Sequence, residues 1–386
     1  MDPILEMLDD VLADVAPLTD GAIADYIPEL ASADPDQLAF AVVGPRGRVI
    51  STGDDRAEFT IQSISKPFVL ALALRERGRE TVLRTVGVEP SGEPFNAISL
   101  EDVTGRPANP LVNAGAIATT SLIEGDTEER TGAIVDILSA FAGRSLWIDE
   151  SVYRSESETG HRNRALGHLL RSYDIIDGVV DDIVEAYFRQ CSVLVTVRDL
   201  AVMAGTLAFG GVNPVTGHRV VSERIARDVV SIMASCGMYD SSGEWLLRVG
   251  LPAKSGVSGG LVAVAPSQFG VGAFSPRLDD HGNSVRAAAV VERLSEDFGM
   301  HLLEIHETIS EPAISVERVD GGVTVRLGGE LGFAGAERVL SVLKDAVRAD
   351  VHVTVDARDV ARLHPAAASL LRARLDVDPG SLTFLE

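Results

Sequence analysis

The order of the predicted strands and helices is the feature that most restricts the fold of this chain. Residues 38–50 are typical of a β-hairpin that turns at 44–47. Two further apolar strands follow much later, at 260–265 and 269–274, and the segments between the two strand sets are mainly helical. We therefore expect an α+β fold, in which the two strand sets pair into one antiparallel sheet beside a cluster of helices.

The helices are predicted from apolar residues that recur every three or four positions. An amphipathic helix opens the chain, and a second begins near Ser63 and carries an apolar run to Leu74. Thr196 begins a capping box, and its helix is expected to end at Gly210 and Gly211. A Gly/Pro/Asn-rich loop at 88–113 is long enough to suggest a functional role. The other helices are expected at about 129–142, 162–172, 178–190, 222–235 and 285–302.

A change in composition near residue 305 predicts a second, smaller domain. We expect a first domain over 1–305, a polar linker over 306–312 and a β/α domain over 313–386. The strands of the small domain are expected around 323–327 and 351–355, and its helices near 334–348 and 366–375.

Charge and composition narrow the functional classes. The net charge of −23 opposes binding to nucleic acid or to an anionic membrane. The two cysteines form no C-x-x-C pair, and the eight histidines have no ligand spacing, so neither a metal nor another cofactor is expected. The acidic N-terminus lacks a signal-peptide pattern, and no apolar stretch reaches spanning length, so a cytoplasmic protein is expected.

Ser63 and Lys66 form an S-x-x-K pattern at the start of a predicted helix. This spacing places a hydroxyl and an amine on one helix face, one turn apart. A buried lysine has a lowered pKa and can take the proton of a serine nucleophile, as in S-x-x-K acyl-transfer enzymes. The alternative is a helix cap followed by a solvated lysine, and an isolated S-x-x-K favours that alternative.

A second motif in the expected order strengthens the catalytic interpretation. Lys254-Ser255-Gly256 comes just before a predicted strand, where β-lactamases and penicillin-binding proteins carry a K-T/S-G motif beside the same pocket. Taken alone, this motif would indicate only a turn before a strand.

Over roughly residues 20–303 the chain resembles the serine-dependent glutaminases, which share the β-lactamase-like fold. The segments that carry the resemblance occur in the family order and are found at 25–30, 59–74, 89–96, 106–117, 155–163, 187–192, 236–243 and 250–257. Asn-Ala-Gly-Ala-Ile at 113–117 and Gly-Met-Tyr-Asp at 237–240 are absent in this form from β-lactamases.

The resemblance implies hydrolysis of L-glutamine to L-glutamate and ammonia. Ser63 would attack the side-chain amide and form a γ-glutamyl ester, with Lys66 as the general base. Tyr239, alone or together with Tyr187, would pass the proton to the leaving ammonia. Whether the lysine or a tyrosine takes the serine proton first stays open.

The same resemblance assigns binding roles. The backbone N–H groups of Ser63 and Val257 would form the oxyanion hole. Glu156 would bind the substrate α-ammonium group, and Asn113 and Asn163 the α-carboxylate and neighbouring polar groups. Tyr26 would line the pocket wall.

Several of these residues also have simpler explanations. Glu156 lies in a polar run and would suit a solvated helix face, Asn113 would suit a helix cap, and Tyr187 would suit a hydrophobic core. Cys191 and Cys236 are interpreted as buried small apolar residues rather than nucleophiles.

Residues 313–386 resemble a STAS domain, the fold of sulfate-transporter and anti-sigma-factor-antagonist modules. Thr354-Val355-Asp356 ends a strand as in that fold, but the phosphoacceptor segment reads Leu363-His-Pro-Ala-Ala367. Without a hydroxyl there, phosphorylation control of the usual kind is not expected. We expect a regulatory or protein-binding role; the alternative is a part that aids oligomerisation or folding.

The leading hypothesis is thus a glutaminase with L-glutamine as substrate. The family usually forms dimers or tetramers, so a homodimer or homotetramer is expected, with a possible protein partner for the STAS-like domain. One alternative is a β-lactamase or peptidase of the same fold, which acylation by penicillin would reveal. The other is a pseudoenzyme that binds partners through the STAS-like domain.

Overall fold

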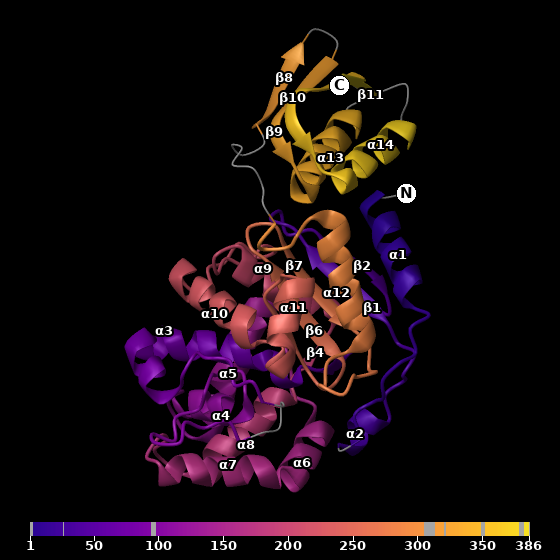
Figure 1. The fold of residues 1–386 in the computed structure, drawn as a ribbon. Helices are drawn as coiled ribbons and strands as arrows, with labels where there is room; N and C mark the ends of the chain where they lie inside the picture. Colours follow the sequence, from indigo (N-terminus) through magenta and orange to yellow (C-terminus); the bar gives the residue numbers. More distant parts are fainter. Residues whose placement is uncertain are drawn as a thin grey trace. The chain divides into compact units, whose positions relative to one another are not determined.

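The computed structural model describes residues 3–25, 27–93, 98–304, 313–319, 322–348, 352–377 and 382–385. The chain divides into two compact units, each of which can be followed in Figure 1. The larger unit spans Asp9–Glu292, and the smaller combines Met1–Leu8 with Arg293–Glu386. The predicted linker at 306–312 lies outside the described residues, and the predicted domain boundaries stay a prediction. Across the described ranges, no helix is both long and apolar enough to cross a membrane.

A five-stranded antiparallel sheet forms the centre of the larger unit, in the order β2-β1-β7-β6-β5. Its strands are β1 (Ala39–Val43), β2 (Val49–Gly53), β5 (Ala253–Ser255), β6 (Gly260–Ala265) and β7 (Phe269–Phe274). The predicted pairing of the two strand sets is confirmed, because β1 and β7 lie side by side with Val42 opposite Val271. Lys254 lies within the edge strand β5, so its interpretation as a turn residue is wrong.

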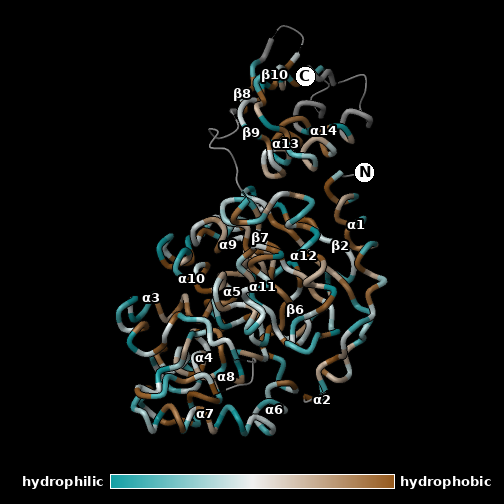
Figure 2. The backbone as a smooth tube through the Cα atoms, viewed as in Figure 1, coloured by the Kyte–Doolittle hydropathy of each residue, from teal (hydrophilic) through white to brown (hydrophobic). Residues whose placement is uncertain are grey.

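Helix α9 (Val197–Ala208) packs directly on the inner strands because two glycines in β7 leave room for its backbone. A Cβ atom at Gly270 would lie 2.0 Å from the backbone nitrogen of Gly205, and one at Gly272 would lie 2.4 Å from the carbonyl oxygen of Val197. All residues of β1, β6 and β7 are buried, so the sheet is apolar on both faces. Figure 2 shows the hydrophobic residues gathered on these inner elements.

A cluster of helices lies beside the sheet (Figure 1). It contains α3 (Lys66–Thr85), α4 (Asn113–Ser121), α5 (Thr127–Ala142), α6 (Glu150–Thr159), α7 (His161–Ser172) and α8 (Val180–Cys191). The other helices of the chain's first three hundred residues are α1 (Pro3–Val15), α2 (Pro28–Ala31), α10 (Glu223–Cys236), α11 (Ser242–Arg248) and α12 (Val285–Phe298).

The predicted helices are confirmed to within a few residues, with two kinds of exception. Helix α12 ends at Phe298 rather than near residue 302. Helices α2, α4, α6 and α11 were not predicted. Helix α4 consists mainly of small and hydroxyl residues, and α6 buries only Val152 and Glu156, so neither shows a clear apolar periodicity. Part of the predicted loop, residues 94–97, lies outside the described residues.

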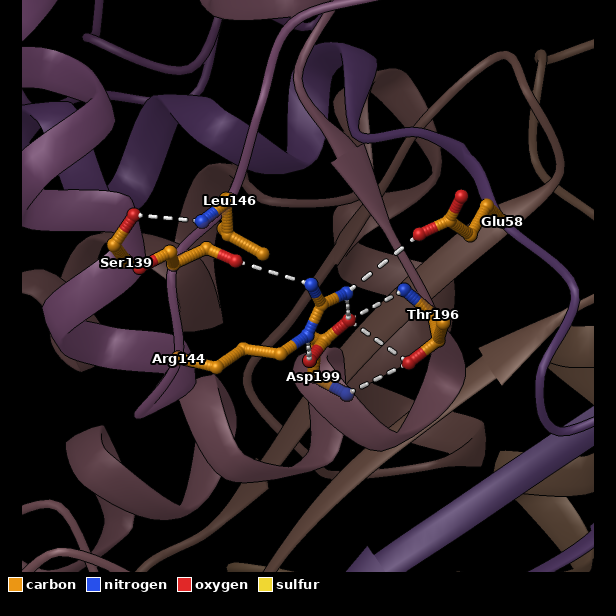
Figure 3. A network of polar contacts seen from close by, with 7 residues as sticks. Glu58, Ser139, Arg144, Leu146, Thr196 and Asp199 are labelled. Atoms are coloured by element: carbon orange, nitrogen blue, oxygen red, sulfur yellow. Dashed lines mark hydrogen bonds and ion pairs between the residues drawn. The ribbon is translucent and has the colours of Figure 1, made fainter.

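A partly buried ion pair connects the strands that lead to Ser63. Strand β3 (Phe59–Thr60) pairs with β4 (Leu194–Val195), after which the capping box of Thr196 and Asp199 begins α9 as predicted. Arg144 donates Nε and Nη2 to the two Asp199 carboxylate oxygens, at 2.7 and 2.6 Å (Figure 3). Its guanidinium also lies 4.0 Å from Glu58, directly before β3. This bidentate pair therefore connects both strands to the start of α9.

The smaller unit contains a four-stranded sheet in the order β11-β10-β9-β8, in which β10 runs parallel to β9 and β11 while β8 and β9 are antiparallel. Its elements are β8 (Ala313–Val319), β9 (Gly322–Leu331), α13 (Phe333–Arg348), β10 (His352–Leu363), α14 (Pro365–Val377) and β11 (Leu382–Leu385). The strand predicted at 351–355 continues to Leu363, because β9 pairs with it along that length through two irregularities.

Candidate active site

Ser63 lies in a short, strained turn between strand β3 and helix α3. It belongs to the 3-10 helix η1 (Gln62–Ser65), and its neighbour Gln62 has φ of 49°, which non-glycine residues rarely adopt. The turn is held by Ser65, which donates to the Gln62 carbonyl at 2.7 Å and accepts from Gln190 Nε2 at 2.9 Å. Ser65 therefore has a structural role in this turn. Such strain persists only where the surroundings enforce it, and it is concentrated at functional sites.

Lys66 is the first residue of α3 and is almost fully buried. Its ammonium Nζ donates to Asn113 Oδ1 at 2.6 Å and to the Leu111 carbonyl at 3.4 Å. Burial lowers the pKa of Lys66 from 10.5 to about 8, although electrostatic interaction with Cys191 and Glu156 acts in the opposite direction. The alternative of a solvated lysine is therefore wrong.

Asn113 connects three of the predicted site residues. It is the first residue of α4 and makes no capping bond, so the helix-cap alternative is wrong. Its Oδ1 accepts from Lys66 and, at 3.3 Å, from the Tyr187 hydroxyl, while its Nδ2 donates to Asn163 Oδ1 at 3.1 Å. Asn163 comes from α7 and Tyr187 from α8, so the helical cluster supplies one wall of the site.

Glu156 extends into the same wall from α6. Its side chain is buried, so the solvated-face alternative is wrong, and Gln62 hydrogen-bonds its carboxylate. Burial raises the pKa of Glu156 from 4.5 to about 7, although the Gln62 bond and the charge of Lys66 act in the opposite direction. A cationic partner would stabilise the ionised form of this buried carboxylate.

Tyr239 forms the opposite side of the site, from the short helix η2 (Tyr239–Ser241). It has φ of 56° and is buried, a second strained residue in the same site. Its hydroxyl hydrogen-bonds both Ser63 and Ser255, and burial nevertheless raises its pKa to about 12. The tyrosine therefore stays protonated at neutral pH while its oxygen contacts the Ser63 side chain.

Lys254 lies on the face of the Tyr239 ring. Its Nζ is 3.8 Å from the ring centroid and donates to the Ser255 carbonyl at 2.8 Å. Burial, followed by repulsion from Lys66, lowers the pKa of Lys254 well below its usual value. The chain contains three lysines, Lys66, Lys254 and Lys344, so two of them are buried at one site.

Val257 follows the β5 strand in a tight turn. Within the described residues its backbone N–H has no hydrogen-bond partner, and the same is true of Ser63 N–H in the first turn of η1. Free backbone donors of this kind are what an oxyanion hole requires. Tyr26, the remaining predicted site residue, lies outside the described residues.

Sequence reasoning missed Gln62 and Asn283, and it gave no site role to Cys191 or Ser255, although all four belong to the network. Cys191 is buried as predicted and hydrogen-bonded to Tyr187, and burial raises the pKa of its thiol to about 12, which makes it a poor nucleophile. Tyr187 is buried in a hydrophobic cluster as well as bonded to Asn113, so both of its predicted explanations apply. The scarcity of lysine was a further sequence signal for the site, because two of the three lysines, Lys66 and Lys254, lie in it.

Comparison with known proteins identifies the family. The family model described as Glutaminase matches residues 21–303. A glutaminase of Corynebacterium efficiens is 46% identical over 377 residues, which cover 97% of this chain and 89% of that protein. A glutaminase of Trichormus variabilis is 49% identical over 303 residues, or 78% of this chain and 91% of that protein.

Solved structures agree with the sequence relatives. A crystal structure of Mglu has 43% sequence identity to this chain and a TM-score of 0.78. The match covers 100% of this chain and 98% of the Mglu chain. The structure of the probable glutaminase ybaS has 41% sequence identity to this chain and a TM-score of 0.77. This match covers 78% of this chain and 99% of the ybaS chain. The chain therefore belongs to the glutaminase family, and it is an enzyme of that class.

Proposed function

We propose that this enzyme hydrolyses L-glutamine to L-glutamate and ammonia through a covalent ester on Ser63. In the first half, the Ser63 oxygen bonds to the side-chain amide carbon, the C–N bond breaks, and the serine proton leaves with the nitrogen as ammonia. In the second half, water adds to the ester, the C–O bond breaks, and Ser63 regains a proton. The observation that carries the proposal is Ser63 hydrogen-bonded to Tyr239 and followed one turn later by the buried Lys66.

Lys66 serves as the general base in this proposal. With a pKa of about 8, a useful fraction of the amine is neutral near neutral pH, which an exposed lysine could not provide. Tyr239 assists the transfer of the proton to the leaving ammonia, because its hydroxyl already contacts Ser63. Tyr187 holds Asn113 from the other side and is the second tyrosine available to the proton path.

The oxyanion that forms on the amide oxygen is stabilised by the N–H groups of Ser63 and Val257. Loss of one such donor typically lowers the rate by about 10²–10³. The Glu156 carboxylate binds the α-ammonium group, and the amides of Asn113 and Asn163 bind the α-carboxylate. This division follows from charge, since Glu156 is the buried carboxylate facing Gln62 and the two asparagines offer N–H donors.

The test is ammonia release from L-glutamine, with L-asparagine as the control substrate, by the wild type and Ser63→Ala. Glutamine turnover that disappears in the variant, together with a glutamyl adduct on rapidly quenched wild-type protein, supports the proposal. Turnover retained by a folded Ser63→Ala would contradict the role of Ser63. Acylation by penicillin would favour the β-lactamase or peptidase alternative instead.

We also propose that the C-terminal unit is a STAS-like module with a regulatory or protein-binding role, and that the enzyme is a homodimer or homotetramer. The four-stranded sheet with helices α13 and α14 supports the first part. The segment Leu363–Ala367 spans the end of β10 and the start of α14, and no hydroxyl is present there for phosphorylation. Light scattering of the full chain tests the oligomer, and affinity capture with the full chain as bait tests partner binding.

A further inference from the structure

The carboxylate of Glu185 on α8 joins three helices and is not used by the mechanism above. It accepts from two hydroxyl groups of α6, that of Tyr153 at 2.7 Å and that of Ser157 at 2.9 Å. It also forms an ion pair with the guanidinium of Arg164 on α7, which donates to the Ser157 carbonyl at 3.1 Å as well. Helices α6 and α7 each pack on α8 (Figure 1), and we call these four residues the Glu185 clamp.

Two members of the clamp lie directly beside residues of the candidate active site. Ser157 follows Glu156 in the sequence, and Arg164 follows Asn163. Successive residues of a helix are turned by about 100°, so the clamp and the site occupy neighbouring faces of the same two helices. A movement of α6 or α7 at the clamp must therefore also move a site residue.

Helix α6 depends on polar contacts of this kind for its position. It buries only two side chains, Val152 and Glu156, so it has little apolar surface to hold it against α8. The connection from α6 to α7 is the single residue Gly160, where a Cβ atom would lie 2.2 Å from the Phe188 ring of α8. The corner between the two helices is thus packed tightly on α8, and the clamp sets how they diverge from that corner.

The clamp is charged and partly shielded from water. The side chains of Arg164 and Glu185 are 25% and 22% exposed, so salt and water screen their attraction less than they screen an exposed pair. Burial raises the pKa of Glu185, but the hydrogen bonds that it accepts within the clamp outweigh burial and hold this pKa below its usual value. The carboxylate is therefore ionised at neutral pH and accepts from both helices.

The chemistry of the substrate makes this spacing important. In the proposed function, Glu156 binds the α-ammonium group and Asn163 the α-carboxylate, and both groups are attached to one carbon atom of L-glutamine. Their separation is fixed, so both are bound at once only when α6 and α7 keep one relative position. A misplacement of about 1 Å can cost about 10²-fold in activity.

We propose that Glu185 is a positioning residue that sets the separation of Glu156 and Asn163, so that both α-groups of the substrate are bound together. The inference rests on the proposed binding roles of those two residues. Glu185 acts through Ser157 and Arg164 rather than by contact with the substrate. Without its carboxylate, α6 loses its bonds to α8 at the clamp, and the affinity for L-glutamine falls.

The experiment is a double-mutant cycle on the full chain, with ammonia release from L-glutamine as the assay and L-glutamate as a competitive inhibitor. Glu185→Ala should raise KM and the inhibition constant of L-glutamate by about tenfold each, with kcat within about twofold of the wild type. Glu156→Gln should raise KM by itself. Adding Glu185→Ala to Glu156→Gln should then raise KM by no more than about twofold, because Glu185 acts largely through Glu156.

Two milder variants test the clamp in part. Glu185→Gln keeps one acceptor oxygen and the shape of the side chain, and it should raise KM by only about threefold. Tyr153→Phe removes one hydrogen bond and keeps the ring, and it should raise KM by about twofold. Combined with Glu185→Ala, Tyr153→Phe should add nothing further, because its hydroxyl acts through Glu185.

Glu158→Ala, at an exposed position of α6, is the matched control, because it makes the same charge change and should leave kcat and KM unchanged. An unchanged KM in folded Glu185→Ala, or a full additional loss in the Glu156→Gln background, would overturn the proposal. If Glu185→Ala does not fold, an unchanged KM in Tyr153→Phe overturns it instead. A wild-type KM in Glu156→Gln would refute the proposed role of Glu156, so the two failures give different results.

Discussion

Replacement of Lys66 by methionine should abolish turnover and yet stabilise the fold. The unfolded chain keeps the Lys66 proton up to about pH 10.5, whereas the folded enzyme keeps it only up to about pH 8. Below pH 8 both states are charged, and the folded state bears a penalty of about 3 kcal/mol for the buried charge. Stability should rise with pH between 8 and 10.5, because there the unfolded chain alone holds the proton.

Methionine has a similar shape and no charge, so it removes this penalty. It also removes the hydrogen bonds to Asn113 and the Leu111 carbonyl, and their loss offsets about 1 kcal/mol of this gain in stability. We therefore expect Lys66→Met to be more stable than the wild type by about 2 kcal/mol at pH 7. The gain should shrink as the pH approaches 10.

Tryptophan fluorescence during urea unfolding is the suitable assay. Both tryptophans, Trp147 and Trp245, lie in the larger unit, so the signal follows the part of the molecule that contains Lys66. Lys344→Met, at an exposed position of α13, is the matched control and should show no pH-dependent gain. A Lys66→Met variant that is less stable than the wild type at pH 7, or a difference that stays constant between pH 7 and 10, would refute the reasoning.

Three further predictions concern pH, packing and domain structure. Because the pKa of Glu156 is about 7 and that of Lys66 about 8, kcat/KM for L-glutamine should rise as the pH increases through this range; a profile that falls there would contradict the assigned roles. Gly270→Ala should lower the free energy of unfolding by at least about 1–3 kcal/mol because its Cβ meets the α9 backbone. Gly132→Ala lies at an exposed position of α5, where the added Cβ meets nothing, and it should raise that free energy by about 0.5–1 kcal/mol. Equal urea midpoints for the two variants would argue against the packing account. A chain ending at residue 304 should keep glutamine turnover within a few-fold, because the match to ybaS covers 78% of this chain but 99% of the ybaS chain. A truncated chain that folds but is inactive would show that the C-terminal unit is needed.

The central sheet was predictable because its strands are short apolar runs at the two ends of one segment, and apolar strands of this kind must pair to satisfy their backbones. Helices α4 and α6 were not predictable from periodicity. The residues of α4 are small, and α6 is largely polar, so tertiary contacts rather than an amphipathic face stabilise them.

Only part of the site was predictable from the sequence. Ser63, Lys66 and Lys254 stand in recognisable motifs, and the family resemblance supplied the partners that come from other helices. Gln62 and Asn283 carry no sequence signal of their own. Gln62 reaches the site through a φ of 49°, and Asn283 accepts a hydrogen bond from Ser255, 28 residues earlier in the chain, so both contributions appear only in three dimensions.

The burial of Lys66 and Lys254 has a practical consequence for attaching the enzyme to a surface. Amine-directed coupling reagents need an accessible primary amine, and of the three lysine side chains only that of Lys344, on α13, is exposed. Coupling under native conditions would therefore produce a nearly uniform conjugate, with a side-chain linkage in the C-terminal unit and both site amines unmodified. Labelling of Lys66 or Lys254 would then report opening of the pocket.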